Sequence, residues 1–141
     1  MKRITHLAAA AFAIVMAPAA IAEEPLLVGY WYSEDYQPNF RVTAQEVTLR
    51  RADGTYEDEF RRYEDCKLVL LQHESGTWTL VGDQLHTTTT SVNGRLAHFE
   101  DDYEVRTLTE KQFQYFHPKL GQLFTDTKVR ANFRFPDCLT S

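Results

Sequence analysis

Histidines are the first residues in this sequence whose chemistry suggests a site. Those that follow residue 22 are His73, His86, His98 and His117. Imidazole nitrogens bind zinc and copper well, so two of these side chains on neighbouring strands would suit a transition metal. The spacings between them do not match a short metal-binding motif, however. We therefore expect ordinary surface or core histidines, with no metal site and no cofactor.

Acidic residues occur in small groups that would suit a hydrolase. These groups are Glu34-Asp35, Glu57 to Glu59, Glu64-Asp65 and Glu100 to Asp102. Glycoside hydrolysis requires two carboxyls about 5–10 Å apart across a cleft, whereas these groups lie in or beside predicted turns, where solvated acids are common. The serines lack the Gly-x-Ser-x-Gly pattern of an activated nucleophile, and no glycine-rich phosphate motif is present. We expect no catalytic residues.

Aromatic and threonine side chains offer a different kind of site. The sequence predicts that Trp78, Thr88, Tyr103 and Tyr115 line an apolar pocket with a few polar groups, which is how small-ligand sites are commonly built. Thr88 belongs to the run Thr87 to Thr90, whose alternate side chains face opposite sides of a strand. Inward threonines would line a cavity, and outward ones would form ordinary strand surface. Both arrangements fit the sequence.

The N-terminal residues predict export from the cytoplasm. Residues 1–22 combine a basic start, an apolar run over residues 7–16, and the small residues Ala20 and Ala22 before a cleavage point. This pattern is typical of a secretory signal peptide. The alternatives are a buried N-terminal helix and a retained anchor. We expect residues 23–141 to form one domain in the periplasm or outside the cell.

Cys66 and Cys138 are the only cysteines, so a single intramolecular pair is possible. An oxidising compartment favours a disulfide. It would close a loop of roughly 70 residues, which the chain-entropy model values at about 4 kcal/mol of stability. The two cysteines are too far apart in sequence for a Cys-x-x-Cys redox or zinc motif.

The charge balance limits the possible partners. The chain has 20 acidic against 15 basic residues. This balance disfavours nucleic acid and an anionic membrane surface, since both attract clustered Lys and Arg. The pairs Arg50-Arg51 and Arg61-Arg62 stand beside acids, and a solvated strand face explains them. No apolar run after residue 22 has membrane-spanning length, so we expect no membrane span.

Short runs rich in Val, Thr, Tyr, Phe and Trp predict strands throughout the rest of the chain. The expected strands cover residues 27–32, 42–50, 55–63, 66–73, 77–81, 84–91, 95–100, 103–107, 112–117 and 122–135. Asp53-Gly54, Ser75-Gly76, Gly82-Asp83 and Asn93-Gly94 are the turn signals between several of them. Residues 108–114 fit a short helix as an alternative.

Strands joined by tight turns, with no helical crossover, predict an antiparallel meander. Such a meander loses its exposed edges when it closes on itself. We therefore expect an all-β, up-and-down barrel of about eight strands, whose interior is filled or holds one small ligand. A two-sheet sandwich is the alternative, because periodicity does not distinguish it from a barrel.

Three sequence features resemble the lipocalins and related calycin barrels. Gly29-Tyr30-Trp31 resembles the Gly-x-Trp motif on the first strand of that family. Cys66 and Cys138 resemble the bridge from a middle strand to the C-terminal tail, and Asp101-Asp102-Tyr103 resembles the Thr-Asp-Tyr element of a later turn. The closest description is a short lipocalin-like domain of the kind found in bacterial secreted proteins.

The resemblance also implies roles for individual residues. In the family the tryptophan closes one end of the barrel, so Gly29 and Trp31 are expected there. An arginine from a late position lies across its ring as a cation–π contact, which implies Arg130 or Arg134 here.

Together these features predict a non-enzymatic barrel that binds a small apolar or amphipathic ligand. The alternative is an inhibitor or protein-interaction module that acts through the barrel-end loops 33–41 and 116–122. In support of that alternative, the strand Cys66 to Leu70 resembles a strand of small disulfide-bonded barrels that inhibit periplasmic enzymes.

Overall fold

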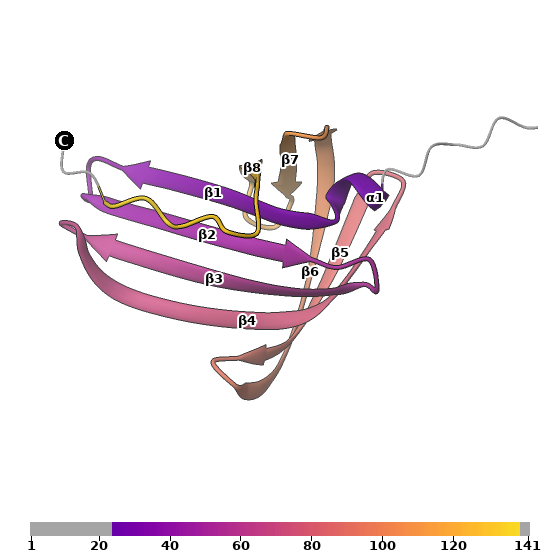
Figure 1. Cartoon of the computed structure of the whole chain (residues 1–141), viewed down its shortest axis with the longest axis horizontal. Coiled ribbons are helices and arrows are strands. Elements are labelled where there is room, and N and C mark those ends of the chain that lie inside the picture. Colours follow the sequence, from indigo (N-terminus) through magenta and orange to yellow (C-terminus); the bar gives the residue numbers. More distant parts are fainter. Residues whose placement is uncertain (1–23, 139–141) are drawn as a thin grey trace, which may run out of the picture.

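Eight antiparallel strands form a closed barrel in the computed structural model, which describes residues 24–138 (Figure 1). The elements are α1 (Glu24–Leu27), β1 (Gly29–Gln37), β2 (Val42–Arg50), β3 (Thr55–Glu64), β4 (Lys67–Val81), β5 (Gln84–Val92), β6 (Arg95–Leu108), β7 (Gln112–His117) and β8 (Gln122–Val129). The all-β up-and-down barrel is thus confirmed, and the sandwich is excluded. The barrel is compatible with a lipocalin-like fold. The predicted signal peptide, residues 1–22, lies outside the described residues.

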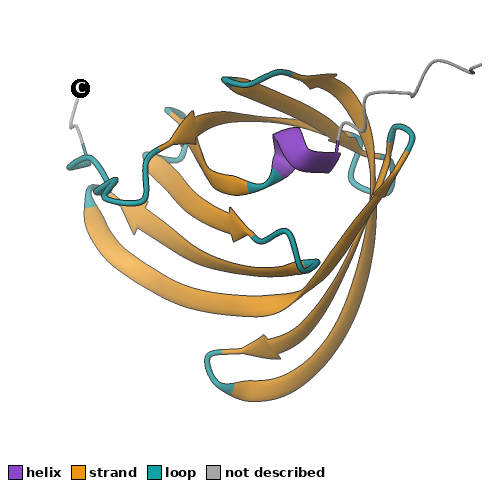
Figure 2. Cartoon of the chain, turned by 45° about the vertical axis from the view of Figure 1, so that its right-hand side comes forward, coloured by secondary structure: helices purple, strands orange, loops and turns teal. Residues whose placement is uncertain are grey.

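The first and last strands close the barrel through a short contact. β1 and β8 pair at Tyr30 with Val129, Trp31 with Lys128, and Tyr32 with Thr127. Beyond Tyr32 the two strands separate, whereas β1 and β2 remain paired to the end of β1. Figure 2 shows how strongly the strands curve round to reach this closure. In the described part of the chain, no helix is long and apolar enough to cross a membrane.

Two predicted turns are absent, which is why the ten predicted runs form the eight strands of the barrel. Ser75-Gly76 lies within the continuous strand β4, where the register with β5 shifts. A Cβ atom on Gly76 would lie 1.9 Å from the carbonyl oxygen of Thr88. The glycine therefore allows a close approach of two strands and makes no turn. β6 likewise continues through Asp101-Asp102.

The end of the barrel that carries α1 is closed by a compact core. Its buried members are Leu27, Trp31, Tyr56, Trp78, Leu85, Phe113 and Tyr115. The indole nitrogen of Trp31 donates to the carbonyl oxygen of Leu27 at 2.8 Å. Trp31 therefore closes this end, as the resemblance implied.

The cation on Trp31 is a lysine, so the expectation of Arg130 or Arg134 is wrong. Lys128 Nζ lies 4.5 Å from the centroid of the Trp31 ring and donates to the carbonyl oxygen of Val28. The register explains this, because Lys128 stands directly opposite Trp31 and paired residues share a face. Gly29 makes room for it: φ is +117°, and a Cβ there would lie 2.8 Å from Lys128 Nζ.

After β8 the chain leaves the barrel and crosses its outer surface, so the strand predicted to residue 135 ends earlier. Figure 1 shows this C-terminal tail running along β1 and β2. The Phe133 ring contacts Tyr32 at 4.7 Å, and Arg61 lies 4.0 Å from the centroid of Phe135. The tail ends in the predicted disulfide between Cys66 and Cys138, whose Cα atoms are 5.3 Å apart.

Candidate functional site

The inside of the barrel contains a cavity of about 290 Å³. Strands β2 to β7 all contribute to it, because every second side chain of a strand faces inward. The lining residues are Glu46, Thr48, Arg50, Tyr56, Asp58, Phe60, Gln72, Glu74, Thr87, Thr89, Asp101, Tyr103 and Tyr115. The lining thus combines four aromatic rings with a larger number of charged, amide and hydroxyl groups. The cavity is more polar than the sequence predicted.

Two of the predicted ligand-binding residues line this cavity. Tyr103 and Tyr115 face each other with ring centroids 5.3 Å apart and nearly perpendicular planes. The Tyr115 hydroxyl donates to Asp126 at 3.3 Å, and burial raises the pKa of this carboxyl to about 7.

Thr88 is the predicted residue that faces the wrong way. Its hydroxyl lies 3.4 Å from His86 Nε2 on the outer side of β5, and the inward positions belong to its neighbours Thr87 and Thr89. An alternating run of four threonines does not reveal which pair points inward.

Trp78 also lies outside the cavity lining. Its side chain is 2% exposed and belongs to the core of the closed end. The indole nitrogen donates to the carbonyl oxygens of Arg51 and Thr55, at 3.2 and 3.1 Å. Trp78 therefore anchors the β2–β3 turn and belongs to the core that closes this end of the barrel.

Arg50 is the functional candidate that the sequence did not identify. It lines the cavity, is 5% exposed, and its guanidinium lies 5.4 Å from the centroid of Phe113. Among the described residues, neither Nε nor Nη1 has a hydrogen-bond partner. Its neighbour Arg51 points outward and pairs with Glu57 at 2.8 Å. The expectation that both arginines lie on a solvated face is thus wrong for Arg50.

A signal for this arrangement exists in β2. Glu46, Thr48 and Arg50 alternate with Val47 and Leu49, but alternation alone gives no reason to place the polar face inside. The C-terminal tail supplies that reason, because its phenylalanine side chains form an outer hollow with Val47 and Leu49. The apolar face of β2 is therefore covered on the outside, and its polar face lines the interior.

Carboxyl groups gather opposite Arg50. Burial raises the pKa of Glu46, and the Thr48 hydroxyl donates to its Oε1 at 3.2 Å. Burial, and then the neighbouring charges of Glu46 and Glu74, raise the pKa of Asp58 to about 8. Like charges held close together in a poorly solvated place retain protons in this way. Asp58 is therefore largely protonated at neutral pH.

A hydrogen-bonded chain fixes the other polar groups in the cavity. The hydroxyls of Tyr56 and Thr89 are 2.6 Å apart, and Thr89 lies 3.5 Å from Glu74. Gln72 Nε2 donates to the second oxygen of Glu74 at 2.5 Å. These contacts engage Tyr56, Thr89, Gln72 and Glu74, whereas Arg50 Nε and Nη1 and Asp58 Oδ1 have no hydrogen-bond partner among the described residues.

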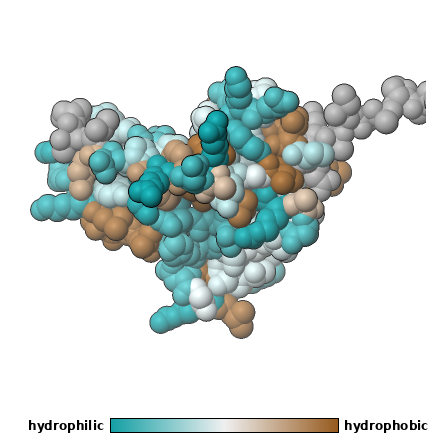
Figure 3. Space-filling model, viewed as in Figure 1, coloured by the Kyte–Doolittle hydropathy of each residue, from teal (hydrophilic) through white to brown (hydrophobic). Residues whose placement is uncertain are grey.

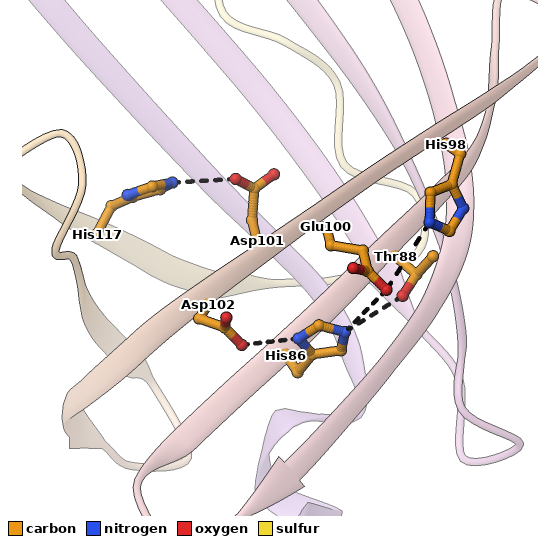
Figure 4. Close-up of polar contacts among 7 residues, drawn as sticks. All are labelled: His86, Thr88, His98, Glu100, Asp101, Asp102 and His117. Atoms are coloured by element: carbon orange, nitrogen blue, oxygen red, sulfur yellow. Dashed lines mark hydrogen bonds and ion pairs between the residues drawn. The ribbon is translucent and has the colours of Figure 1, made fainter.

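The histidines fall on both sides of the barrel wall, as Figure 4 shows. On the outer face, His86 Nδ1 lies 2.7 Å from Asp102, and His98 Nε2 lies 3.8 Å from Glu100. Facing inward, buried His117 contacts Asp101 at 3.1 Å. Within residues 24–138, no group of His, Cys, Asp or Glu has the arrangement of a metal site.

A groove between β1 and β8 adjoins the cavity. It occupies about 420 Å³ and is lined by the second half of β1, the start of β2, and residues 122–125 of β8. Glu46 and Phe60 line both the groove and the cavity. The two spaces therefore meet at these side chains.

Comparison of the chain with protein-family models gave no matching family, and comparison with curated protein sequences gave no match.

Proposed function

We propose that this protein is a non-enzymatic, periplasmic or secreted barrel of the lipocalin type that binds a small, partly apolar molecule in its interior. The observation that carries the proposal is Arg50, a buried residue of the cavity lining whose guanidinium atoms Nε and Nη1 have no hydrogen-bond partner among the described residues. Buried donors without partners are costly, and native proteins nearly always satisfy them. An occupant with a hydrogen-bond acceptor would supply the missing partner.

The other lining groups define what else this molecule carries. Asp58, Glu46 and Glu74 favour an occupant with a donor group, such as a hydroxyl or amide, beside its acceptor. The rings of Phe60, Tyr103 and Tyr115 suit an apolar body. The proposed ligand is thus amphipathic, with a polar head at Arg50.

Native mass spectrometry of protein purified from its own host tests this proposal. We expect the wild type to carry a stoichiometric small-molecule mass and Arg50→Met to bind it at least about tenfold more weakly, since hydrogen bonds to charged groups are worth about 1.5–3 kcal/mol. Methionine keeps an unbranched side chain next to Phe113. Arg51→Met is the matched control, because its side chain points outward and should leave binding unchanged.

Two results would contradict the proposal. One is a wild-type protein that carries no added mass in any preparation. The other is equal retention by wild type and Arg50→Met. The same intact masses report whether residues 1–22 are removed, which tests the proposed export.

A second candidate is a protein-interaction or inhibitory role through the loops 33–41 and 116–122. Phe40 and Leu120 favour it, because these side chains are 75% and 66% exposed at the turns of the two loops. A pull-down that returned one stoichiometric protein partner, while native spectra showed no retained small molecule, would support this candidate over the first.

A further inference from the structure

One end of the barrel displays apolar side chains in an unusual pattern. Successive turns of an up-and-down barrel alternate between its two ends, so the turns β1–β2, β3–β4, β5–β6 and β7–β8 share the end away from α1. At each of these turns, either within it or in the first two residues of the next strand, an apolar residue lies directly beside a basic one. These pairs are Phe40-Arg41, Lys67-Leu68, Arg95-Leu96 and Lys119-Leu120, and we call them the open rim.

The apolar members of the open rim are strongly exposed. Phe40 is 75%, Leu68 50%, Leu96 97% and Leu120 66% exposed. Figure 3 shows apolar surface at the start of β4, on the left, and at the β5–β6 turn, at the bottom. At the closed end, by contrast, Val81 is the one exposed large hydrophobic residue adjoining a turn in the described part. Exposed apolar groups thus concentrate on one end.

The charges of the open rim differ from those of the whole chain. Arg41 pairs with Asp65 at 2.5 Å, but Lys67, Arg95 and Lys119 make no ion pair within the described residues. Three cations that form no ion pair within the described residues therefore stand at the open end of an acidic protein. The acids Glu64 and Asp65 at the same end pair with Arg62 and Arg41. At physiological ionic strength charges are screened within about 8 Å, so a surface that touches the rim senses the three cations more than acids elsewhere on the barrel.

We propose that the open rim docks onto a lipid bilayer that contains anionic headgroups. Basic side chains would contact the phosphates while their apolar neighbours enter the boundary below, as in other interfacial anchors. The four turns are separate, and a bilayer can receive each of them independently. A specific protein partner instead requires a continuous patch of about 800 Å² on each side. The inference requires the barrel but no ligand in its cavity.

Vesicle flotation tests this inference directly. The wild-type chain, after removal of its signal, is mixed with vesicles of phosphatidylcholine alone or of phosphatidylcholine with phosphatidylglycerol. We expect binding to the anionic vesicles only, with loss at high salt. Phe40→Ser combined with Leu96→Ser and Leu120→Ser should weaken binding more than about tenfold, since burying even one such side chain is worth about 1.5–3 kcal/mol.

Matched variants at the closed end control for a general loss of hydrophobicity or charge. Val81→Ser removes an exposed apolar side chain there and should bind like the wild type. For the cations, Arg95→Gln with Lys119→Gln should reduce binding to anionic vesicles, whereas Lys111→Gln in the β6–β7 turn should not. Circular dichroism and the urea midpoint confirm that each variant is folded.

Several outcomes would overturn the inference. Absence of wild-type binding to both vesicles is one, and equal losses for the rim and closed-end variants is another. Capture of one stoichiometric protein partner, abolished by the rim variants in the absence of vesicle binding, would assign the rim to a protein instead. None of these results depends on whether Arg50 binds a small molecule, so the two proposals fail separately.

Discussion

At the scale of single residues, Asp58 makes stability depend on pH. Its pKa is raised from 3.8 to about 8 in the folded protein, so the folded state holds a proton that the unfolded chain releases between these values. Stability is therefore complete below the unfolded pKa and falls as pH rises through the folded one. We expect the urea midpoint to decrease between about pH 5 and about pH 8.

Variants assign that decrease to the interior carboxyls. Asp58→Asn removes one titrating carboxyl, so the urea midpoint of this variant should decrease less over the same pH range. Burial raises the pKa of Asp126 to about 7, so adding Asp126→Asn should remove most of the remaining decrease. Asp83→Asn at the exposed β4–β5 turn should behave like the wild type. A double variant with the full wild-type slope would refute this origin of the pH dependence.

Lys128 gives a second prediction at this scale. Lys128→Met removes its hydrogen bonds to the carbonyl oxygens of Leu26 and Val28 and its contact with Trp31, and we expect a loss of about 1–3 kcal/mol. Arg130→Met, two residues later on the exposed chain, should cost less than about 0.5 kcal/mol. Equal unfolding free energies for the two variants would contradict the role given to Lys128.

The sequence could identify the rings of the site better than its charges. Tyr103 and Tyr115 were found because a large aromatic side chain on a barrel strand has few places to lie other than inside. The prediction for Thr88 was wrong by one position, because adjacent residues of a strand point to opposite faces. Arg50 was missed because its inward direction depends on the C-terminal tail, which covers the opposite face of β2. The phenylalanine side chains of that tail follow Arg50 by more than 80 positions in the sequence.

At the scale of elements, Gly76 shows that a glycine can mark proximity as well as a turn. Gly76→Ala would bring a Cβ within 1.9 Å of the Thr88 carbonyl oxygen, so β4 and β5 must move apart. We expect a cost of about 1–3 kcal/mol in urea unfolding, as for other overpacked sites. Ser75→Ala is the neighbouring control and should change stability by less than about 0.5 kcal/mol. A stable Gly76→Ala protein would show that the bulge adapts freely.

The other turn signals were correct for a physical reason. Gly54, Gly82 and Gly94 all have positive φ, which glycine adopts without strain, and Asn93 does so as well. The dipeptide Ser75-Gly76 resembles these signals in sequence, but its glycine allows two neighbouring strands to approach each other closely. Composition alone does not separate a glycine needed for its dihedral angle from one needed for its small size.

At the scale of the whole molecule, the disulfide fastens the tail to the far side of the barrel. Replacing both Cys66 and Cys138 by alanine should lower the free energy of unfolding by about 4 kcal/mol, because the bridge closes a long loop in the unfolded chain. Urea midpoints of the oxidised wild type, the reduced wild type and the double variant measure this. The last two should agree, and unchanged stability in both would show that the bridge is dispensable.

Closure of the barrel was predictable because a long meander with no crossovers has few other ways to protect its edges. The bridge was predictable because two cysteines permit one pairing. The path of the segment after β8 was not predictable. Alternation through Phe133 and Phe135 indicates a strand whether those rings face the barrel core or lie on the outer wall of the barrel.

The brevity of the contact between β1 and β8 bears on the size of molecule that the barrel accepts. Three register pairs hold these strands together, against nine between β2 and β3. Where the pairing stops, a lateral groove lies beside the cavity and shares Glu46 and Phe60 with its lining. For the proposed ligand, an elongated portion would have only these two side chains to pass before it projected through the side of the barrel, so the enclosed volume would not set its length.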